Sequence, residues 1–172
     1  ISACGGQYFP QFDAGKLGIE VDKANQAGIK EFGRQVTKAL LALPPFKDPE
    51  TGNSVQMGQN NTNVISLFSK QAGEDSYRIA NTAAPDFMGR TPGGLPTGAL
   101  MALLHNRGEY DPKNTFRNMS PVGTVFSGTG KPETLSNGTP ALATLVGTKS
   151  WLMGIHHFVI DPDDPFPNGF IL

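Results

Sequence analysis

The segment Glu20–Leu43 constrains the fold of this 172-residue chain more than any other stretch. Its apolar residues recur at steps of three and four, the spacing of one face of an α-helix; they are Ile29, Phe32, Val36, Leu40 and Leu43. Asp22 is placed to accept a backbone N–H at the start of the helix. Pro44 and Pro45 end it, because proline has no N–H and disfavours a helical residue before it. The segment predicts a long amphipathic helix whose apolar face needs a partner.

The rest of the chain predicts shorter elements separated by turns. Thr97 is placed to cap a second helix that ends near Gly108 and is apolar on most sides, so this helix should be central. Short apolar runs predict elements at three places, although two of them are too short to separate strand from helix: Val64–Phe68, Tyr77–Ala80 and Val122–Phe126. Gly128–Pro140 predicts a long loop, and Pro140–Val146 predicts one or two helical turns.

Together these elements predict the α+β class: one long N-terminal helix and a short central helix packed on a small sheet. The chain contains 21 glycines and 14 prolines, which predict a high proportion of irregular loops. A length of 172 residues predicts a single domain, 1–172, in which residues 1–18 form an extended N-terminal arm.

Charge and hydropathy exclude two classes of partner. The net charge is −1, so no basic surface is available to recruit nucleic acid. No apolar run approaches the ~18 residues of a transmembrane helix. Low charge, abundant Gly, Asn and Thr, and a start without Met together favour an extracytoplasmic or secreted protein.

Cys4 is the only cysteine, so no disulfide forms within the chain. The segment Ile1-Ser2-Ala3-Cys4 resembles the lipobox of bacterial lipoproteins, and this resemblance implies a lipid anchor on Cys4. Processing in that family cuts before the cysteine, whereas here Ile1–Ala3 are still present. The alternative is a free thiol near the terminus.

The C-terminal segment Trp151–Ile160 predicts a strand with apolar residues on both faces, as in an internal strand. His156 and His157 are neighbours in it, so their side chains point to opposite faces. Asp161, Asp163 and Asp164 follow in a turn that Pro162 and Pro165 stiffen.

Two alternatives assign chemistry to these residues. In the first, Cys4 is a nucleophile, His156 or His157 is its base, and Asp161 or Asp163 orients the histidine. A late-strand histidine followed by an acidic residue resembles papain-like amidases, but Cys4 neither opens a helix nor follows a glutamine. In the second alternative, a metal ion is bound by His157, Asp161, Asp163 and Asp164. The competing interpretation is a solvated acidic turn beside histidines that belong to the core.

The favoured interpretation assigns neither chemistry, because no catalytic motif has the spacing that its reaction needs. It predicts a non-enzymatic structural or binding component without a cofactor, one subunit of an envelope complex or particle shell. The N-terminal arm and the C-terminal end, Phe170-Ile171-Leu172, would then contact a protein partner or further copies of the chain.

Overall fold

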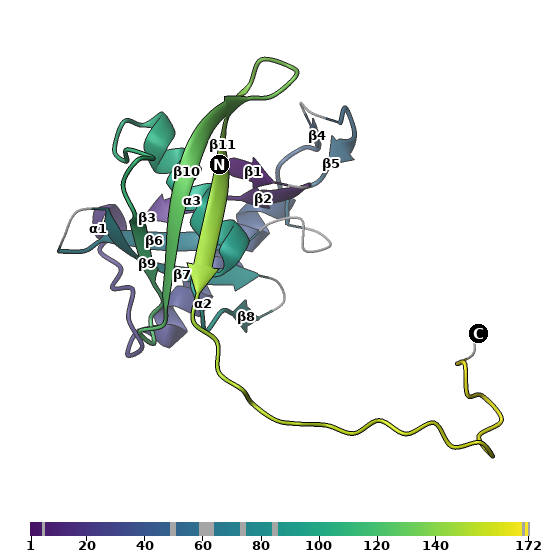
Figure 1. The fold of residues 1–172 in the computed structure, drawn as a ribbon. Helices are drawn as coiled ribbons and strands as arrows, with labels where there is room; N and C mark the ends of the chain where they lie inside the picture. Colours follow the sequence, from purple (N-terminus) through teal and green to yellow (C-terminus); the bar gives the residue numbers. More distant parts are fainter. Residues whose placement is uncertain are drawn as a thin grey trace.

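The computed structural model describes residues 1–4, 6–48, 51–58, 64–72, 75–83, 86–169 and 171. Its main feature is a seven-stranded mixed sheet with the order β11-β10-β9-β7-β6-β3, to which β8 is added beside β7 (Figure 1). The strands are β3 (Gln11–Asp13), β6 (Ile65–Lys70), β7 (Ser76–Ala83), β8 (Phe87–Met88), β9 (Phe116–Met119), β10 (Val125–Thr134) and β11 (Pro140–Thr148).

Four short strands and three helices complete the described chain. The strands form two small antiparallel pairs: β1 (Ser2–Cys4) with β2 (Gln7–Phe9), and β4 (Phe46–Lys47) with β5 (Ser54–Val55). The helices are α1 (Ala14–Leu17), α2 (Gln26–Leu41) and α3 (Gly94–Asn106). Among the described residues, no helix is both long enough and apolar enough to cross a membrane.

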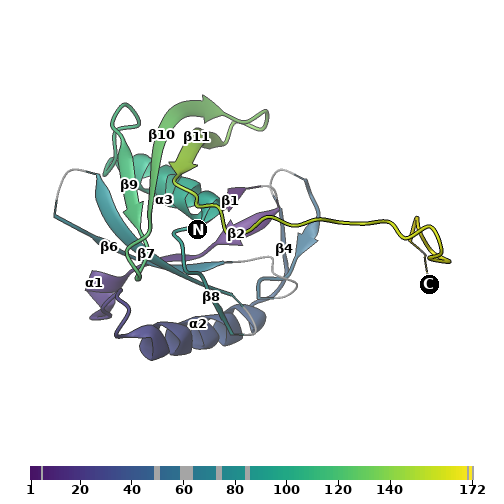
Figure 2. The ribbon, with the colours of Figure 1, turned by 60° about the horizontal axis from the view of Figure 1, so that its bottom comes forward.

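Two parallel strand pairs explain where the long helices lie. β3 pairs in parallel with β6, and β7 pairs in parallel with β9. Parallel neighbours need a crossover connection, which α2 provides for the first pair and α3 for the second. Figure 2 shows the result, with α2 below the central strands and α3 above them, under the curled hairpin of β10 and β11. Strand β6 is therefore covered on both faces, and its first four residues are all buried.

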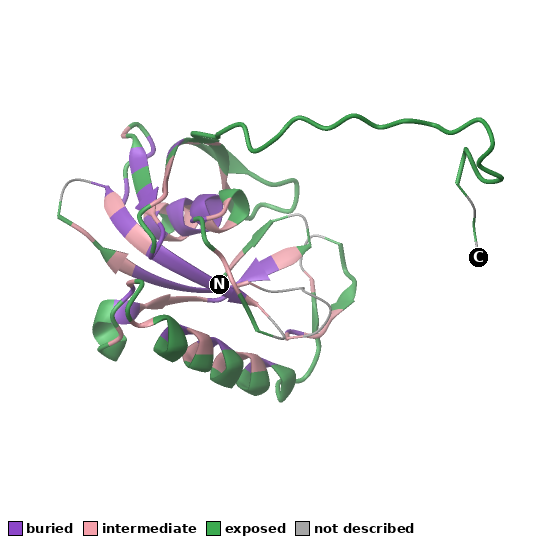
Figure 3. Ribbon diagram, turned by 90° about the horizontal axis from the view of Figure 1, so that it is seen from below, coloured by how far each residue is buried: buried purple, intermediate pink, exposed green. Residues whose placement is uncertain are grey.

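Helix α3 is the centre of the larger apolar core and is buried along most of its length (Figure 3). It packs over an aromatic group in which the Tyr77 ring stacks on Phe116 at 5.1 Å and Tyr110 meets Phe116 edge-on at the same distance. The buried members of this core are Phe68, Tyr77, Ile79, Leu100, Met101, Leu104, Tyr110 and Phe116.

The long helix predicted over Glu20–Leu43 is wrong in extent, because α2 starts only at Gln26 and ends at Leu41. Asp22 does not cap it directly: its carboxylate accepts the N–H of Asn25, the residue before the helix, and so holds the preceding turn. Within α2, Ile29 and Leu40 are buried, while the Phe32 ring is half-buried against Phe12.

The predicted fold class is also wrong, because a large mixed sheet dominates rather than a small sheet among loops. The segments predicted as a loop and as helical turns, Gly128–Pro140 and Pro140–Val146, lie largely in the paired strands β10 and β11. The predicted strand Trp151–Ile160 has no regular secondary structure and is fully exposed. Residues 1–18, predicted as an extended arm, contain β1, β2, β3 and α1.

Candidate functional site

The start of helix α3 is a candidate site because it is built to leave backbone donors free. The residue before the helix, Gly93, has φ +73° and offers no side chain to cap it. The first helical hydrogen bond runs from the N–H of Thr97 to the carbonyl of Gly93, at 3.1 Å. Pro96 has no N–H, and the N–H groups of Gly94 and Leu95, at the start of the helix, have no partner within the described part of the chain. We call residues 92–97 the helix-entry site.

Side-chain hydrogen bonds from Asn81 and Thr124 fix the loop that leads into this site. Asn81 of β7 donates to the carbonyl of Pro92 at 2.7 Å and accepts the hydroxyl of Ser66 at 2.8 Å. Asn81 is 4% exposed, so these hydrogen bonds are shielded from water. From the other side, Thr124 donates its hydroxyl to the carbonyl of Arg90 at 3.1 Å. The Gly93–Gly94 backbone is therefore held in place before any ligand arrives.

The backbone requires glycine at position 93, whereas the space around Gly94 would admit a larger residue. A Cβ on Gly93 would lie 2.9 Å from Pro96 Cδ, and the positive φ already disfavours other residues. A Cβ on Gly94 would meet no atom within 4 Å, so the helix start opens onto free space there. The first turn contains no acidic residue that would compete for its donors.

A buried amide lies directly behind the first turn. Asn118 of β9 is fully buried and donates from Nδ2 to the Thr97 hydroxyl at 3.0 Å. Its Oδ1 atom has no hydrogen-bond partner among the described residues. A buried amide oxygen without a protein partner is costly, so this atom needs a further partner such as a bound water or ligand.

The helix-entry site has the chemistry of an anion-binding site. The aligned peptides of a helix place a partial positive charge of about half a unit at its N-terminus, where free N–H groups point outward. A carboxylate placed there gains both the field and the hydrogen bonds. None of the described side chains that hold this site ionises near neutral pH, since Asn81, Thr97, Asn118 and Thr124 are amides and hydroxyls.

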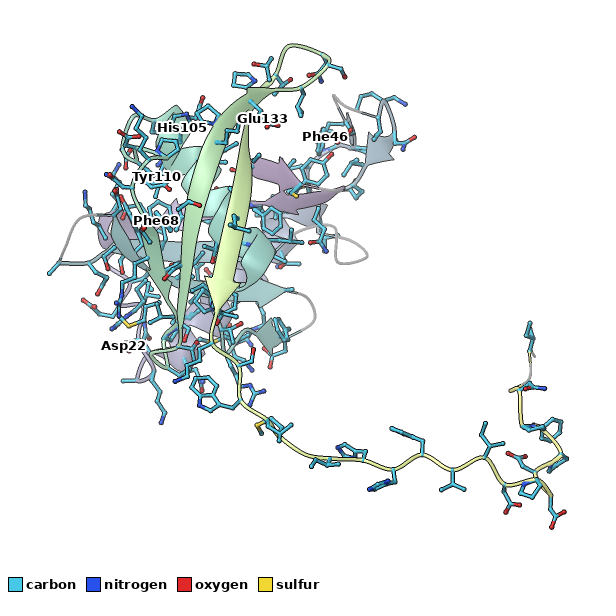
Figure 4. The ribbon with its side chains drawn as sticks, viewed as in Figure 1. Asp22, Phe46, Phe68, His105, Tyr110 and Glu133 are labelled. Carbon is cyan, nitrogen blue, oxygen red and sulfur yellow. The ribbon has the colours of Figure 1, made fainter. Side chains whose placement is uncertain are left out.

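At the opposite end of α3, His105 closes the helix rather than forming a second site. Its Nδ1 atom lies 3.3 Å from the carbonyl of Tyr110 (Figure 4). Burial, with Asp75 and Asp111 nearby, raises the pKa of Tyr110 to about 12. Burial is also the main cause that raises the pKa of Tyr77. Both tyrosines are therefore neutral core residues.

A separate hollow lies between α2 and β7, with a volume of about 310 Å³ and mainly apolar walls. Its rim contains an exposed ion network in which Asp86 accepts from Lys30 and Arg34, each at 2.8 Å. Those hydrogen bonds lower the pKa of the Asp86 carboxyl, the largest effect coming from Lys30. Lys30 and Arg34 are thus already paired with Asp86.

The structure does not bring the predicted site residues together. Cys4 is exposed at the end of β1, whose contact with α3 is made by the Ser2 hydroxyl on the carbonyl of Ala99. His156 and His157 lie in the exposed C-terminal segment, where the His156 ring is 6.5 Å from that of Phe158.

The predicted acidic ligands form a local turn. Asp161 accepts the N–H of Asp163 at 3.0 Å, and its carbonyl accepts the N–H of Asp164 at 3.1 Å. Among the described residues, no group of three potential ligands is arranged to hold a metal ion. The catalytic and metal-binding roles of these residues stay predictions.

Sequence reasoning missed the helix-entry site. It took Thr97 as the cap of the second helix, whereas the helix starts at Gly94 and Thr97 is buried inside it. The available signal was a glycine pair directly before an apolar helix whose first turn has no acidic residue.

Comparison with known proteins gives one family over nearly the whole chain: residues 2–171 match the model named "Proline racemase". A 4-hydroxyproline 2-epimerase from Streptosporangium roseum is 28% identical over 99% of this chain and 50% of its own length. The crystal structure of a probable proline racemase from Agrobacterium radiobacter, with bound carbonate, superimposes with a TM-score of 0.74 at 27% identity, covering 98% of this chain and 48% of the other.

The fold recurs in a hydroxyproline epimerase from Agrobacterium vitis, solved with bound trans-4-hydroxy-L-proline, with a TM-score of 0.73 at 23% identity over 98% of this chain and 47% of that one. The chain thus spans about half the length of the relatives it matches. These relatives are enzymes, so the prediction of a non-enzymatic structural subunit is wrong. The family is named for a racemase, so the alternative of a cysteine-dependent amidase is wrong as well, while metal binding by His157 and Asp161 stays a prediction. The predicted localisation and partners stay predictions.

Proposed function

Since this chain belongs to the proline racemase family, we propose that it supplies one half of an enzyme that inverts the α-carbon of proline or a hydroxyproline. The observation that carries the proposal is the helix-entry site, with free N–H groups at Gly94 and Leu95 and the buried Asn118 behind them. The substrate class comes from the names of the relatives, a 4-hydroxyproline 2-epimerase and a probable proline racemase.

The reaction explains why such a site is needed. To invert an α-carbon, a base removes its proton from one face and a proton returns on the opposite face. Between these steps, the electron pair of the broken C–H bond spreads onto the neighbouring carboxylate, whose negative charge grows. Preorganised N–H donors and a helix dipole stabilise this growing negative charge more than they stabilise the carboxylate of the unreacted substrate.

The residues of this chain then have distinct roles. Gly94 and Leu95 donate backbone N–H groups to the carboxylate, and Asn81 and Thr124 fix the loop that presents them. Asn118 positions the first turn through Thr97. None of the described side chains that hold the site is suited to proton transfer near neutral pH, so we assign proton transfer to the complementary half of the enzyme.

The test is a carboxylate placed on the helix start. Gly94→Asp fills open space and suits the helix dipole, so the fold should be retained. Two like charges about 5 Å apart repel by about 3 kcal/mol at an effective dielectric constant of about 20, which is roughly a hundredfold in affinity. The matched control, Gly94→Asn, has the same shape without the charge.

The readout is exchange of the α-proton for deuterium in D₂O, followed by NMR on L-proline and trans-4-hydroxy-L-proline. The enzyme in this assay is the chain together with the part of the family fold that the chain does not cover. Gly94→Asp should raise KM by one to two orders of magnitude, whereas Gly94→Asn should stay within about threefold of the wild type. Equal effects of the two variants, or no exchange with either substrate, would refute the proposal.

A further inference from the structure

The hollow between α2 and β7 has no role in the proposed reaction. It lies on the face of the sheet that α2 covers, opposite α3 and the helix-entry site (Figure 2). Neighbouring residues of β7 face opposite ways: Asn81 contacts the loop before α3, whereas Thr82 lies against α2 at Gly33. Binding in this hollow would therefore be separate from binding at the helix-entry site.

Small residues keep the space in the hollow open. Gly33 and Thr37 are about one turn apart on α2, and Thr82 and Ala83 end strand β7 beside them. The short side chains of these four residues leave a volume of about 310 Å³ between the two elements. Ten water molecules of the liquid occupy about the same volume. The hollow is thus as large as the smaller sites that hold organic ligands in proteins.

Two large apolar side chains line the same hollow. Leu41, the last residue of α2, is 44% exposed, and Phe87, the first residue of β8, is 60% exposed. Removing such apolar surface from water is favourable, so both side chains gain from a ligand that covers them. The hollow therefore suits a ligand with an apolar body.

The rim of the hollow is rich in positive charge, although the whole chain has a net charge of −1. Its described lining contains three cations, Lys30, Arg34 and Lys38, and one carboxylate, that of Asp86. Asp86 pairs with Lys30 and Arg34, and Arg34 pairs also with Glu31. Lys38 is exposed and has no ion-pair partner among the residues that the structure describes. An unpaired cation beside apolar walls favours a ligand that is both anionic and apolar.

We propose that this hollow is a further binding site, which takes a small organic carboxylate with an apolar body. The apolar body lies between Leu41 and Phe87, and the carboxylate meets Lys38 at the rim. An aromatic or medium-chain carboxylate of about a dozen non-hydrogen atoms has a suitable size. Proline has little apolar surface and carries a positive charge beside its carboxylate, so the hollow and the helix-entry site take different classes of ligand.

The first test compares a charged and a neutral probe on the full chain. The charged probe is 3-(4-fluorophenyl)propanoate, whose ¹⁹F resonance should shift and broaden as protein is added, with a titration that fits one site per chain. The neutral probe, 3-(4-fluorophenyl)propan-1-ol, has the same body but cannot pair with Lys38. It should bind about threefold more weakly. Equal binding of the two probes would overturn the proposal.

Two substitutions then locate the probe in the hollow. Thr37→Leu fills the space from a helical position that suits leucine, so it should abolish saturable binding while the far-UV circular dichroism stays unchanged. Lys38→Gln should weaken binding of the carboxylate about threefold and leave binding of the alcohol unchanged. The matched control is Lys113→Gln, which changes an exposed lysine between α3 and β9 and should affect neither probe.

The exposed apolar segment from Trp151 to Ile160 is the competing surface for such a probe. Binding that survives Thr37→Leu, or equal weakening by Lys38→Gln and Lys113→Gln, would overturn the proposal and assign the probe to other surface. A dissociation constant weaker than about 10 mM would overturn it as well. Because the measurement needs no turnover, its result is independent of the proposed function.

Discussion

Helix α2 lies close against strand β7 at Gly33, and this contact yields a quantitative prediction. A Cβ added to Gly33 would lie 2.2 Å from Thr82 Oγ1 and 2.8 Å from Thr82 Cβ. Thr82 is 6% exposed on a central strand, and turning its side chain would move Oγ1 but not Cβ, whose position the backbone fixes. Gly33→Ala should therefore push the helix off the sheet.

Two opposing contributions set the size of the effect. Replacing glycine with alanine inside a helix gains about 0.5–1 kcal/mol, because the unfolded chain loses freedom. Overpacking a tight contact costs about 1–3 kcal/mol. We expect Gly33→Ala to lower the free energy of unfolding by about 1–2 kcal/mol. Thr82→Ala in the same background should recover part of that loss, since it removes the nearest atom.

Gly28 in the same helix provides the matched control. A Cβ there would lie 2.4 Å from Asn25 Oδ1, the end of a side chain that can move aside. Gly28→Ala should raise stability by up to about 1 kcal/mol. The assay is urea denaturation followed by far-UV circular dichroism. Trp151 lies in the exposed C-terminal segment, so its fluorescence does not report on the core. If Gly33→Ala were as stabilising as Gly28→Ala, the packing of α2 on β7 would be wrong.

Two further predictions concern the aromatic core beneath α3. Phe116→Ala should lower the free energy of unfolding by about 3–5 kcal/mol in the same denaturation assay, because a fully buried ring stacked on Tyr77 leaves a cavity; a loss below about 1 kcal/mol would contradict the stacked core. The pKa of Tyr110 is raised to about 12 by burial and by Asp75 and Asp111, so the folded state holds this proton more tightly than the unfolded chain does. Its contribution of about 2 kcal/mol should be complete below about pH 10 and lost as the pH rises towards 12; denaturation at several pH values should show this loss, and Tyr110→Phe should remove it.

The hairpin of β10 and β11 shows why local rules predicted a loop where strands form. Glycine and proline weaken a strand prediction, and β10 contains both. A Cβ on Gly128 would lie 2.8 Å from Met101 Sδ, and one on Gly130 would lie 2.9 Å from Leu142, so these glycines permit close approach. Pro132 pairs with Leu142 of β11 on one side, while β9 ends its pairing with β10 at Gly128, so β10 is an edge strand at Pro132, where proline is tolerated. Such reasons depend on neighbours distant in sequence, so a local pattern could not supply them.

The helices were more accessible to sequence reasoning than the site. Periodicity is a local property, and it located α3 within about three residues at each end, Thr97–Gly108 against the observed Gly94–Asn106. The helix-entry site depends instead on Asn118, which reaches α3 from β9 through tertiary packing. No spacing along the chain joins these residues, so only the structure could bring them together.

The C-terminal segment Trp151–Ile160 shows what a hydrophobic pattern predicts and what it does not. Its sequence has apolar residues on both faces, from which a buried internal strand was predicted, yet Phe158 is 96% exposed and no strand forms. The pattern records how much surface a segment must bury, but it contains no information about which chain provides the cover. The mismatch between pattern and burial marks Trp151–Ile160 as apolar surface that the described residues leave uncovered.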